Sequence, residues 1–168
     1  MPREPAIIRF MTPAEIDLLA PHVTPERLET YRRRIAEGVQ VMGYFTPDET
    51  ACSAWLWTTG RDYYEPFDRV TYLATPSDAL HLDGEVAADN RGRGVAFTAY
   101  PLVWSHWRRQ GYARIHCTID ELNKPSLKIH DRMGYREAER FSVISLLGLA
   151  WARPGGPRHR PGDARRRG

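Results

Sequence analysis

The stretch EVAADNRGRGVA, from Glu85 to Ala96, leads from a strand-like segment into a helix-like one and carries two glycines, Gly92 and Gly94. Glycine leaves the backbone uncovered and adopts conformations that other residues avoid. Successive N–H groups of such a turn can point at an anion, and the positive end of the following helix favours negative charge there. The turn is therefore a candidate phosphate-binding site. A plain surface turn and a nucleic-acid contact are the alternatives for this fragment alone.

The residues after this turn predict a helix and then a strand. Apolar side chains between Val95 and Trp107 recur at helical spacing, and Gly111 ends the pattern. Pro101 lies inside this helix, where we expect a kink or an irregular first turn because proline has no N–H to donate. Residues 114–120 then have the composition of a strand.

A second helix is expected directly after that strand. Asn123 is its expected N-cap, Pro125 lies in its first turn, and Gly134 marks its C-terminal end. The two segments together give the order strand, turn, helix, strand, helix.

These residues resemble the GCN5-related N-acetyltransferase (GNAT) superfamily. Its acyl-CoA fingerprint is Gln or Arg, two residues, Gly, one residue, then Gly or Ala, and Arg91, Gly94 and Ala96 match it. Its second motif is Asn, a small residue three later, then Gly and an aromatic residue, and it is matched by Asn123, Ser126, Gly134 and Tyr135. The resemblance covers residues 79–147 well and the N-terminal half only in general pattern.

The resemblance implies an α/β fold with a mixed, mostly antiparallel twisted sheet of six to seven strands, about four flanking helices, and a splay at the acyl-CoA site. It also implies an N-acyltransferase that moves an acetyl group from acetyl-CoA, its co-substrate, to an amine by direct attack. The pyrophosphate would lie on backbone N–H groups of the glycine turn, and the pantetheine arm beside the preceding strand. The implied cofactor-binding residues are Val86, Ala87, Ala88, Arg91, Gly92, Arg93, Gly94, Val95, Ala96, Asn123 and Ser126.

An amine with a pKa of about 10 is mostly protonated at neutral pH, so attack needs a base or a desolvated pocket. The superfamily's base usually lies nine or eleven residues before the fingerprint arginine, where this chain has Leu82 and Leu80. The polar residues are one step off, at His81, Asp83 and Glu85. We predict that Glu85 or Asp83 is the base or the acceptor anchor, and that a bulge shifts the face these residues use.

His130 lies where the superfamily often has a tyrosine that protonates the departing CoA thiolate. Histidine can supply that proton, so His130 is the third catalytic candidate. The alternative is a partly buried helix histidine that is hydrogen-bonded to backbone.

The N-terminal half predicts a strand, two helices and a hairpin. Residues 6–10 read as a strand, and Thr12 to Glu15 form a capping box that begins a helix. Another helix begins at Thr24 and ends at Gly38, and residues 39–45 and 51–58 flank a turn as an antiparallel hairpin.

The remaining segments are assigned more coarsely. Residues 60–78 form a loop or an additional strand near the acceptor. Residues 80–86 alternate, with Leu80, Leu82 and Val86 predicted on one face of a strand and His81, Asp83 and Glu85 on the other. Residues 139–147, extending toward Trp151, are expected to complete the sheet.

Length and composition predict one domain over residues 1–152 and a disordered basic tail over 153–168. The resemblance implies that the domain is a GNAT-like acyltransferase. The tail holds six arginines and one acid, which leaves 18 basic and 20 acidic residues in the domain. A nucleic-acid role for the tail is therefore the less favoured interpretation. Cys52 and Cys117 show no disulfide or metal-ligand spacing and indicate buried thiols in a reducing compartment.

The chain has no apolar run that predicts a membrane span or a signal segment, so we expect a cytoplasmic monomer or homodimer with no membrane partner. The expected partners are an acyl-CoA and an amine acceptor, either a small molecule or a protein amine. Two other functions stay open: a catalytically silent acyl-CoA-binding or sensing domain, and an RNA-associated acetyltransferase.

Overall fold

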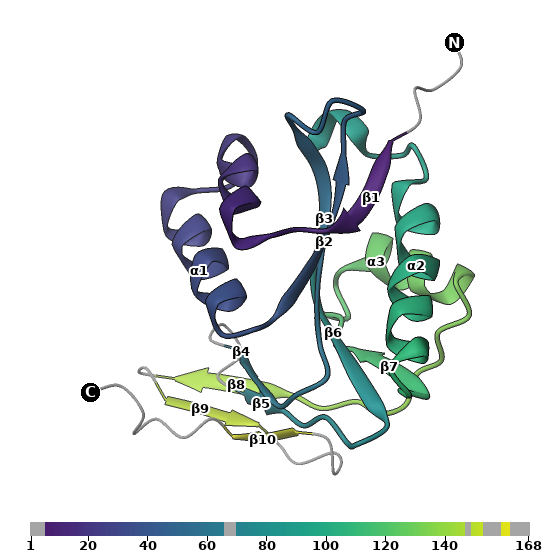
Figure 1. Ribbon diagram of the computed structural model, residues 1–168. Helices are drawn as coiled ribbons and strands as arrows, with labels where there is room; N and C mark the ends of the chain where they lie inside the picture. Colours follow the sequence, from purple (N-terminus) through teal and green to yellow (C-terminus); the bar gives the residue numbers. More distant parts are fainter. Residues whose placement is uncertain (1–5, 66–69, 147–148, 153–158, 162–168) are drawn as a thin grey trace.

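The computed structural model describes residues 6–65, 70–146, 149–152 and 159–161. The chain begins with a strand and two helices, continues with five consecutive strands, and then places further helices among the last strands (Figure 1). In chain order the elements are β1 (Ile7–Phe10), η1 (Pro13–His22), α1 (Pro25–Ala36), β2 (Gln40–Phe45), β3 (Cys52–Thr59), β4 (Tyr63–Glu65), β5 (Val70–Tyr72), β6 (Asp78–Val86), η2 (Ala88–Asn90), α2 (Val95–Arg109), β7 (Arg114–Cys117), α3 (Lys124–Arg132), β8 (Val143–Leu146), β9 (Leu149–Ala152) and β10 (His159–Pro161).

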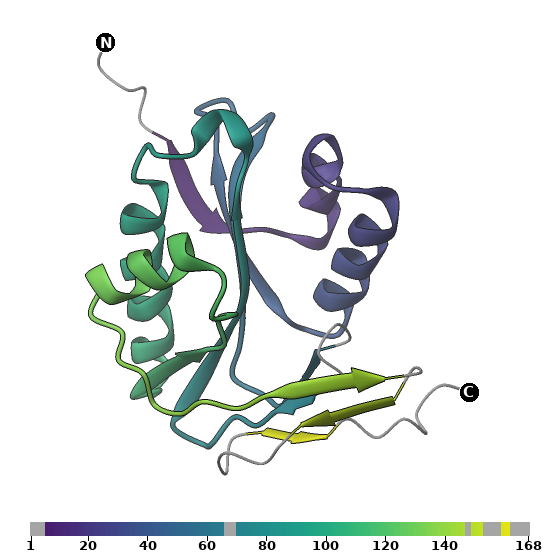
Figure 2. The ribbon, with the colours of Figure 1, turned by 180° about the vertical axis from the view of Figure 1, so that it is seen from behind.

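The main sheet has five strands in the order β1-β2-β3-β6-β7. All neighbours are antiparallel except β6 and β7, which run parallel because α2 crosses between them. Helices η1 and α1 cover one face of this sheet and α2 and α3 the other, as the two opposite views show (Figures 1 and 2). The result is a mixed α/β layer structure with helices on both faces, as the sequence predicts.

Each face of the sheet carries its own apolar core. Under η1 and α1, the buried cluster includes Leu19, Tyr31 and Trp57, which are at most 1% exposed. Under α2, a second cluster includes Val103 and Trp107. Trp55 and Trp57 of β3 are both buried in the first of these clusters. The two cores hold β3 and β6 between them and so fix the strand that carries the predicted site.

Local end signals act as predicted. Glu15 and Thr12 form the capping box, although the segment that follows is a 3₁₀ rather than an α-helix. The side chain of Thr24 accepts a hydrogen bond from the Arg27 N–H at the start of α1, and α3 has the equivalent cap from Asn123. The hairpin of β2 and β3 is present, and α2 runs unbroken through Pro101. Residues 60–78 contain two further strands, β4 and β5, as one of the two alternatives stated.

The C-terminal prediction is wrong in its pairing. The expected strand over residues 139–147 begins only at Val143, and β8 pairs with β9 in a separate two-stranded sheet instead of completing the main one. The main sheet therefore has five strands, not six to seven. Alternating apolar residues predict that a segment is a strand but carry no information on which edge it joins.

The tail also differs in part from a disordered segment. Residues His159–Pro161 form β10, which pairs antiparallel with β5, while the rest of 153–168 lies outside the described residues. The domain boundary predicted at residue 152 stays a prediction. In the part of the chain that the structure describes, no helix combines the length and apolar character that crossing a bilayer requires.

Candidate active site

The sheet opens where β6 leaves β7. Their parallel pairing ends at His81 and Cys117, and β6 continues to Val86 beside β3 alone. The Ala87 N–H donates to the Ser53 carbonyl at 2.8 Å, on the β3 side. Successive residues of a strand point their backbone groups to opposite edges, so the Val86 N–H points into the opening. The opening thus offers an unpaired strand edge to an extended ligand.

The glycine turn, residues 91–96, lies at the end of this edge. Gly92 and Gly94 have φ of 72° and 76°, values that favour glycine, although a Cβ on either would meet nothing within 4 Å. Gly94 is the N-cap of α2, and no side chain caps that helix, unlike α1 and α3. The Arg91 Nε donates to the Val86 carbonyl at 3.1 Å. The first-turn N–H groups of α2 therefore face an uncovered space suited to an anion.

A cavity of about 310 Å³, the motif cavity, connects the two predicted motifs. It lies between β6, the start of α2 and the start of α3, with Leu56 and Tyr100 among its walls. The predicted site residues that line it are Glu85, Val86, Arg91, Val95, Ala96, Asn123, Ser126 and His130. The predicted residues outside its wall are Ala87, Ala88, Gly92, Arg93 and Gly94, which belong to the connection between β6 and α2, and Asp83.

A bulge in β6 separates the three polar residues that the simple alternation places together. Trp57 pairs with Asp83 and Thr58 pairs with His81, so Leu82 is an extra residue without a β3 partner. The prediction that His81, Asp83 and Glu85 share one face of the strand is therefore wrong, whereas the predicted bulge is present. An extra residue reverses the alternation beyond it. His81 faces α2 and α3, and Asp83 faces α1.

Two arginines of α1 hold the acidic residues of β6. Arg27 Nη2 lies 3.2 Å from Asp83 Oδ2 and 2.5 Å from Glu85 Oε1, and Arg34 Nη1 lies 3.2 Å from Asp83 Oδ2. Burial lowers the pKa of Arg27, but interaction with Tyr31, Asp83 and Glu85 raises it by more. Glu85 thus reaches the motif cavity with a fixed cation beside it. Sequence reasoning missed Arg27 because it is 56 residues from Asp83 in the chain.

His130 and His81 approach the same tyrosine hydroxyl. His130 Nδ1 donates to the Ser126 carbonyl at 2.8 Å, and its Nε2 lies 3.4 Å from Tyr100 Oη. His81 Nε2 also lies 3.4 Å from that oxygen. Burial lowers the pKa of His81 to about 3, with a further contribution from His130, and burial lowers the pKa of His130. Both rings are therefore neutral at pH 7.

His130 fits both interpretations of its position: it is buried and bonded to backbone, and it lines the motif cavity. Tyr100 was not predicted. It lies one helical turn beyond Ala96 on α2, and the sequence pattern does not distinguish it from an ordinary aromatic residue of the core.

Solved structures with the same backbone arrangement are acetyltransferases. AAC(6')-Iy, an aminoglycoside N-acetyltransferase in complex with CoA, aligns with 88% of this chain and 99% of its own at 16% identity and a TM-score of 0.67. A ribosomal-protein-alanine N-acetyltransferase from Brucella melitensis biovar Abortus 2308 aligns with 84% and 100% at 12% identity and a TM-score of 0.62. AAC(6')-Ih from Acinetobacter baumannii aligns with 84% and 98% at 18% identity and a TM-score of 0.63.

This chain has the GNAT fold. The superfamily fold predicted from two short motifs is confirmed, down to the splay beside the glycine turn. No family sequence profile matches the chain, and no curated protein sequence does. The fold is therefore recognised through backbone geometry, at an identity where whole-sequence comparison finds nothing.

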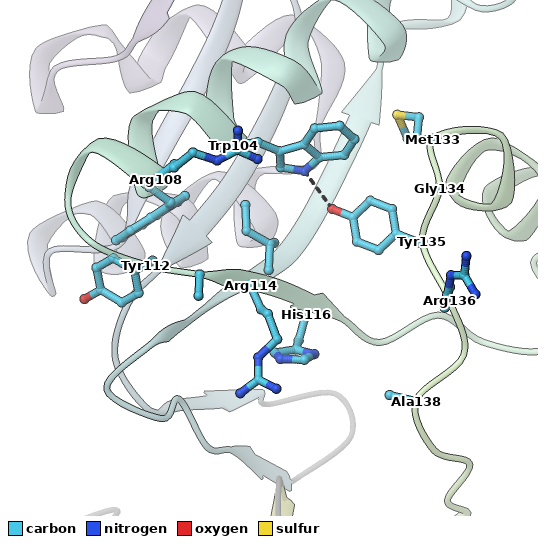
Figure 3. A pocket seen from close by; sticks show the side chains of 13 residues that line it. Trp104, Arg108, Tyr112, Arg114, His116, Met133, Gly134, Tyr135, Arg136 and Ala138 are labelled. Carbon is cyan, nitrogen blue, oxygen red and sulfur yellow. Dashed lines mark hydrogen bonds between the residues drawn. The ribbon is translucent and has the colours of Figure 1, made fainter.

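The structure has a second cavity, of about 410 Å³, beside β7 (Figure 3). It lies between the end of α2, β7 and the segment after α3, and it contains no predicted site residue. Trp104 Nε1 donates to Tyr135 Oη across it at 3.1 Å, and Arg114 pairs with Asp78 at 2.8 Å. Although larger, this cavity lacks the glycine turn and the acidic residues, so the motif cavity is the candidate active site.

Proposed function

We propose that this protein is an acyl-CoA-dependent N-acyltransferase that transfers an acetyl group from acetyl-CoA to an amine by direct attack. The motif cavity carries the proposal, because it joins the glycine turn, the open edge of β6 and the start of α3 in one space. Proteins of the same fold solved with CoA, such as AAC(6')-Iy, support the choice of cofactor.

The cofactor would bind mainly through backbone groups. The pyrophosphate would lie against the N–H groups of residues 92–96, where the α2 dipole favours negative charge. The pantetheine amides would pair with the free edge of β6, as an added strand does. The Val86 carbonyl already accepts from Arg91, so the Val86 N–H is the group left for the thioester oxygen, which gains negative charge during attack. Asn123 and Ser126 would contact the cofactor from α3.

Glu85 is the base that the geometry favours. Glu85 is one of the residues that line the cavity, whereas Asp83 is outside it and is held by Arg34 and Tyr31. Arg27 fixes the position of Glu85. His130, on the opposite wall, would take up a proton at Nε2, which carries the lone pair, and then give it to the departing thiolate.

The acceptor is an amine on a small molecule or a protein. Structures of the same fold are named for aminoglycosides and for a ribosomal protein's alanine, so both kinds belong in the first screen. We also propose that the protein acts in the cytoplasm as a monomer or homodimer, without nucleic acid or membrane.

CoA binding tests the first half of the proposal. CoA should bind in a calorimeter and raise Tm, because a ligand specific to the folded state stabilises it. Gly94→Glu should abolish both effects, since it places a carboxylate at the helix N-terminus. Gly38→Glu is the matched control: it too has positive φ and open space around it, but it ends α1 on the other face of the sheet. A Gly94→Glu protein that binds CoA like wild type would refute the phosphate site.

Release of free CoA from acetyl-CoA in the presence of amines tests the second half. Aminoglycosides, small polyamines and peptides with a free N-terminus cover the two acceptor classes. Turnover with any of them supports an enzyme. Tight CoA binding with no turnover across the panel would instead favour an acyl-CoA-binding or sensing role.

A further inference from the structure

Three potential metal ligands from three elements meet at the point where the sheet opens. His81 on β6 and Cys117 on β7 are the last paired residues of the parallel strands. From α3, His130 stacks against His81 with ring centroids 5.6 Å apart and planes 30° apart. One imidazole nitrogen from each histidine and the Cys117 sulfur all lie within 4.8 Å of one another. Among the described residues this is the one such group of His, Cys and acidic side chains.

Each neutral imidazole of the cluster keeps one nitrogen lone pair. Because His130 Nδ1 donates to the Ser126 carbonyl, its Nε2 carries the lone pair. Both Nε2 atoms lie 3.4 Å from Tyr100 Oη, whose single proton can be donated to only one of them, so a bound cation would displace this hydroxyl. Within the part of the chain that the structure describes, the buried Nδ1 of His81 has no hydrogen-bond partner. His81 is 6% exposed, so water does not readily satisfy that atom.

We propose that His81, Cys117 and His130 form a binding site for a soft divalent cation, with Zn²⁺ the best match. Imidazole nitrogen with thiolate sulfur is a zinc ligand set, and three protein ligands leave a fourth position open. A tetrahedral zinc ion requires its ligand atoms to be about 3.4 to 3.6 Å apart, so the cluster closes by roughly 1 Å. The His130–Ser126 hydrogen bond is the kind of contact that orients a metal-bound imidazole.

Binding would release the Cys117 thiol proton to solvent, because the thiolate is the form that coordinates zinc. The chain spacing, 36 residues from His81 to Cys117 and 13 more to His130, gives no linear metal motif, and none was expected. The pairing of β6 with β7 and the packing of α3 create the cluster.

The site has a consequence that rests on the proposed function. His130 lines the motif cavity, so a cation bound at Nε2 blocks the nitrogen that would carry a proton to the departing CoA thiolate. Zn²⁺ should then inhibit acetyl transfer. Binding itself does not depend on the activity, and the two are measured separately.

Cobalt substitution is the direct test. Tag-free protein kept reduced with a phosphine is titrated with Co²⁺, which reports a thiolate ligand through a near-ultraviolet charge-transfer band and tetrahedral geometry through visible bands. One equivalent should produce both, and Zn²⁺ should displace them stoichiometrically. Cys117→Ser should abolish the near-ultraviolet band and weaken Zn²⁺ binding by at least about 100-fold, the upper end of the loss seen for partners outside the ligand set.

Cys52→Ser is the matched control, because Cys52 is a fully buried thiol in the other core and donates to the Ala54 carbonyl at 3.1 Å. It should retain both bands. If Cys117→Ser does not fold, His81→Phe, which keeps a planar ring, replaces it with the same expected loss of affinity. The proposal is overturned if wild type shows no thiolate band, or if the band survives Cys117→Ser or disappears in Cys52→Ser. A loss of catalysis alone has no bearing on these spectra.

Discussion

Arg34 is a buried cation, and its replacement by methionine should be strongly destabilising. Its side chain is 3% exposed, and its guanidinium contacts Tyr63 Oη at 2.7 Å, Asp83 Oδ2 at 3.2 Å and Glu65 Oε2 at 3.3 Å. Burial lowers the pKa of Arg34, but interaction with Tyr63, Glu65 and Asp83 raises it by more, so the charge is retained. Methionine keeps the length of the side chain and removes that charge.

The loss of stability in Arg34→Met depends on the acidic side chains that lose their contact with Arg34. Removing one partner of a buried ion pair costs about 3 to 5 kcal/mol, because the other charge stays buried without compensation. In Arg34→Met, Asp83 keeps Arg27, whereas Glu65, 12% exposed at its side chain, loses Arg34. We therefore expect the lower end, about 3 kcal/mol. For a domain of this size that corresponds to a fall in Tm of about 6 to 12 °C.

Thermal and urea unfolding of three variants measure this. Arg32→Met, in the same helix, removes the exposed pairs to Asp17 and Glu29 and should change stability little, because exposed ion pairs contribute little. Arg34→Met with Glu65→Gln should recover at least about 1 kcal/mol, because the negative charge that Arg34 faced is then also removed. If Arg34→Met lowers Tm no more than Arg32→Met, the buried network contributes no measurable stability and the reasoning is refuted.

Further predictions concern catalysis, pH and the tail. Glu85→Gln should lower the rate of the chemical step and leave CoA affinity unchanged. His130→Phe should lower that rate less, because a thiolate leaves well unaided. Wild-type turnover of Glu85→Gln at every pH would place the base elsewhere. The Arg9 hydrogen bond lowers the pKa of Glu15 to about 2, below the value in the unfolded chain. The ionised Glu15 therefore stabilises the fold above pH 4.5, and this contribution is lost as pH falls toward 2. Glu15→Gln should flatten that part of the Tm–pH curve. Deleting residues 155–168 should leave CoA affinity unchanged by calorimetry, as β10 adds only three paired residues to β5, and a lost fold would contradict this.

The sequence alone determined the features that depend on neighbours in the chain. The capping box at Thr12, the cap at Asn123 and the glycine at the end of each helix act over a few residues, so their chemistry is visible locally. The same holds for the glycine turn, because positive φ at Gly92 and Gly94 is a property of glycine itself. With two motifs in order, these signals predicted the GNAT fold and eight of the residues that line the motif cavity.

Only the tertiary structure decided which side chains face one another. The bulge at Leu82 depends on how β3 pairs with β6, and it turned His81 away from Asp83. Arg27 and Arg34 reach β6 because α1 packs on that face. β8 pairs with β9, its neighbour in the chain, and whether it also joins the main sheet depends on strand edges that are distant in sequence. The His81–Cys117–His130 cluster has the same origin. Strand register and helix packing are set by burial summed over the whole chain, which no short segment of sequence contains.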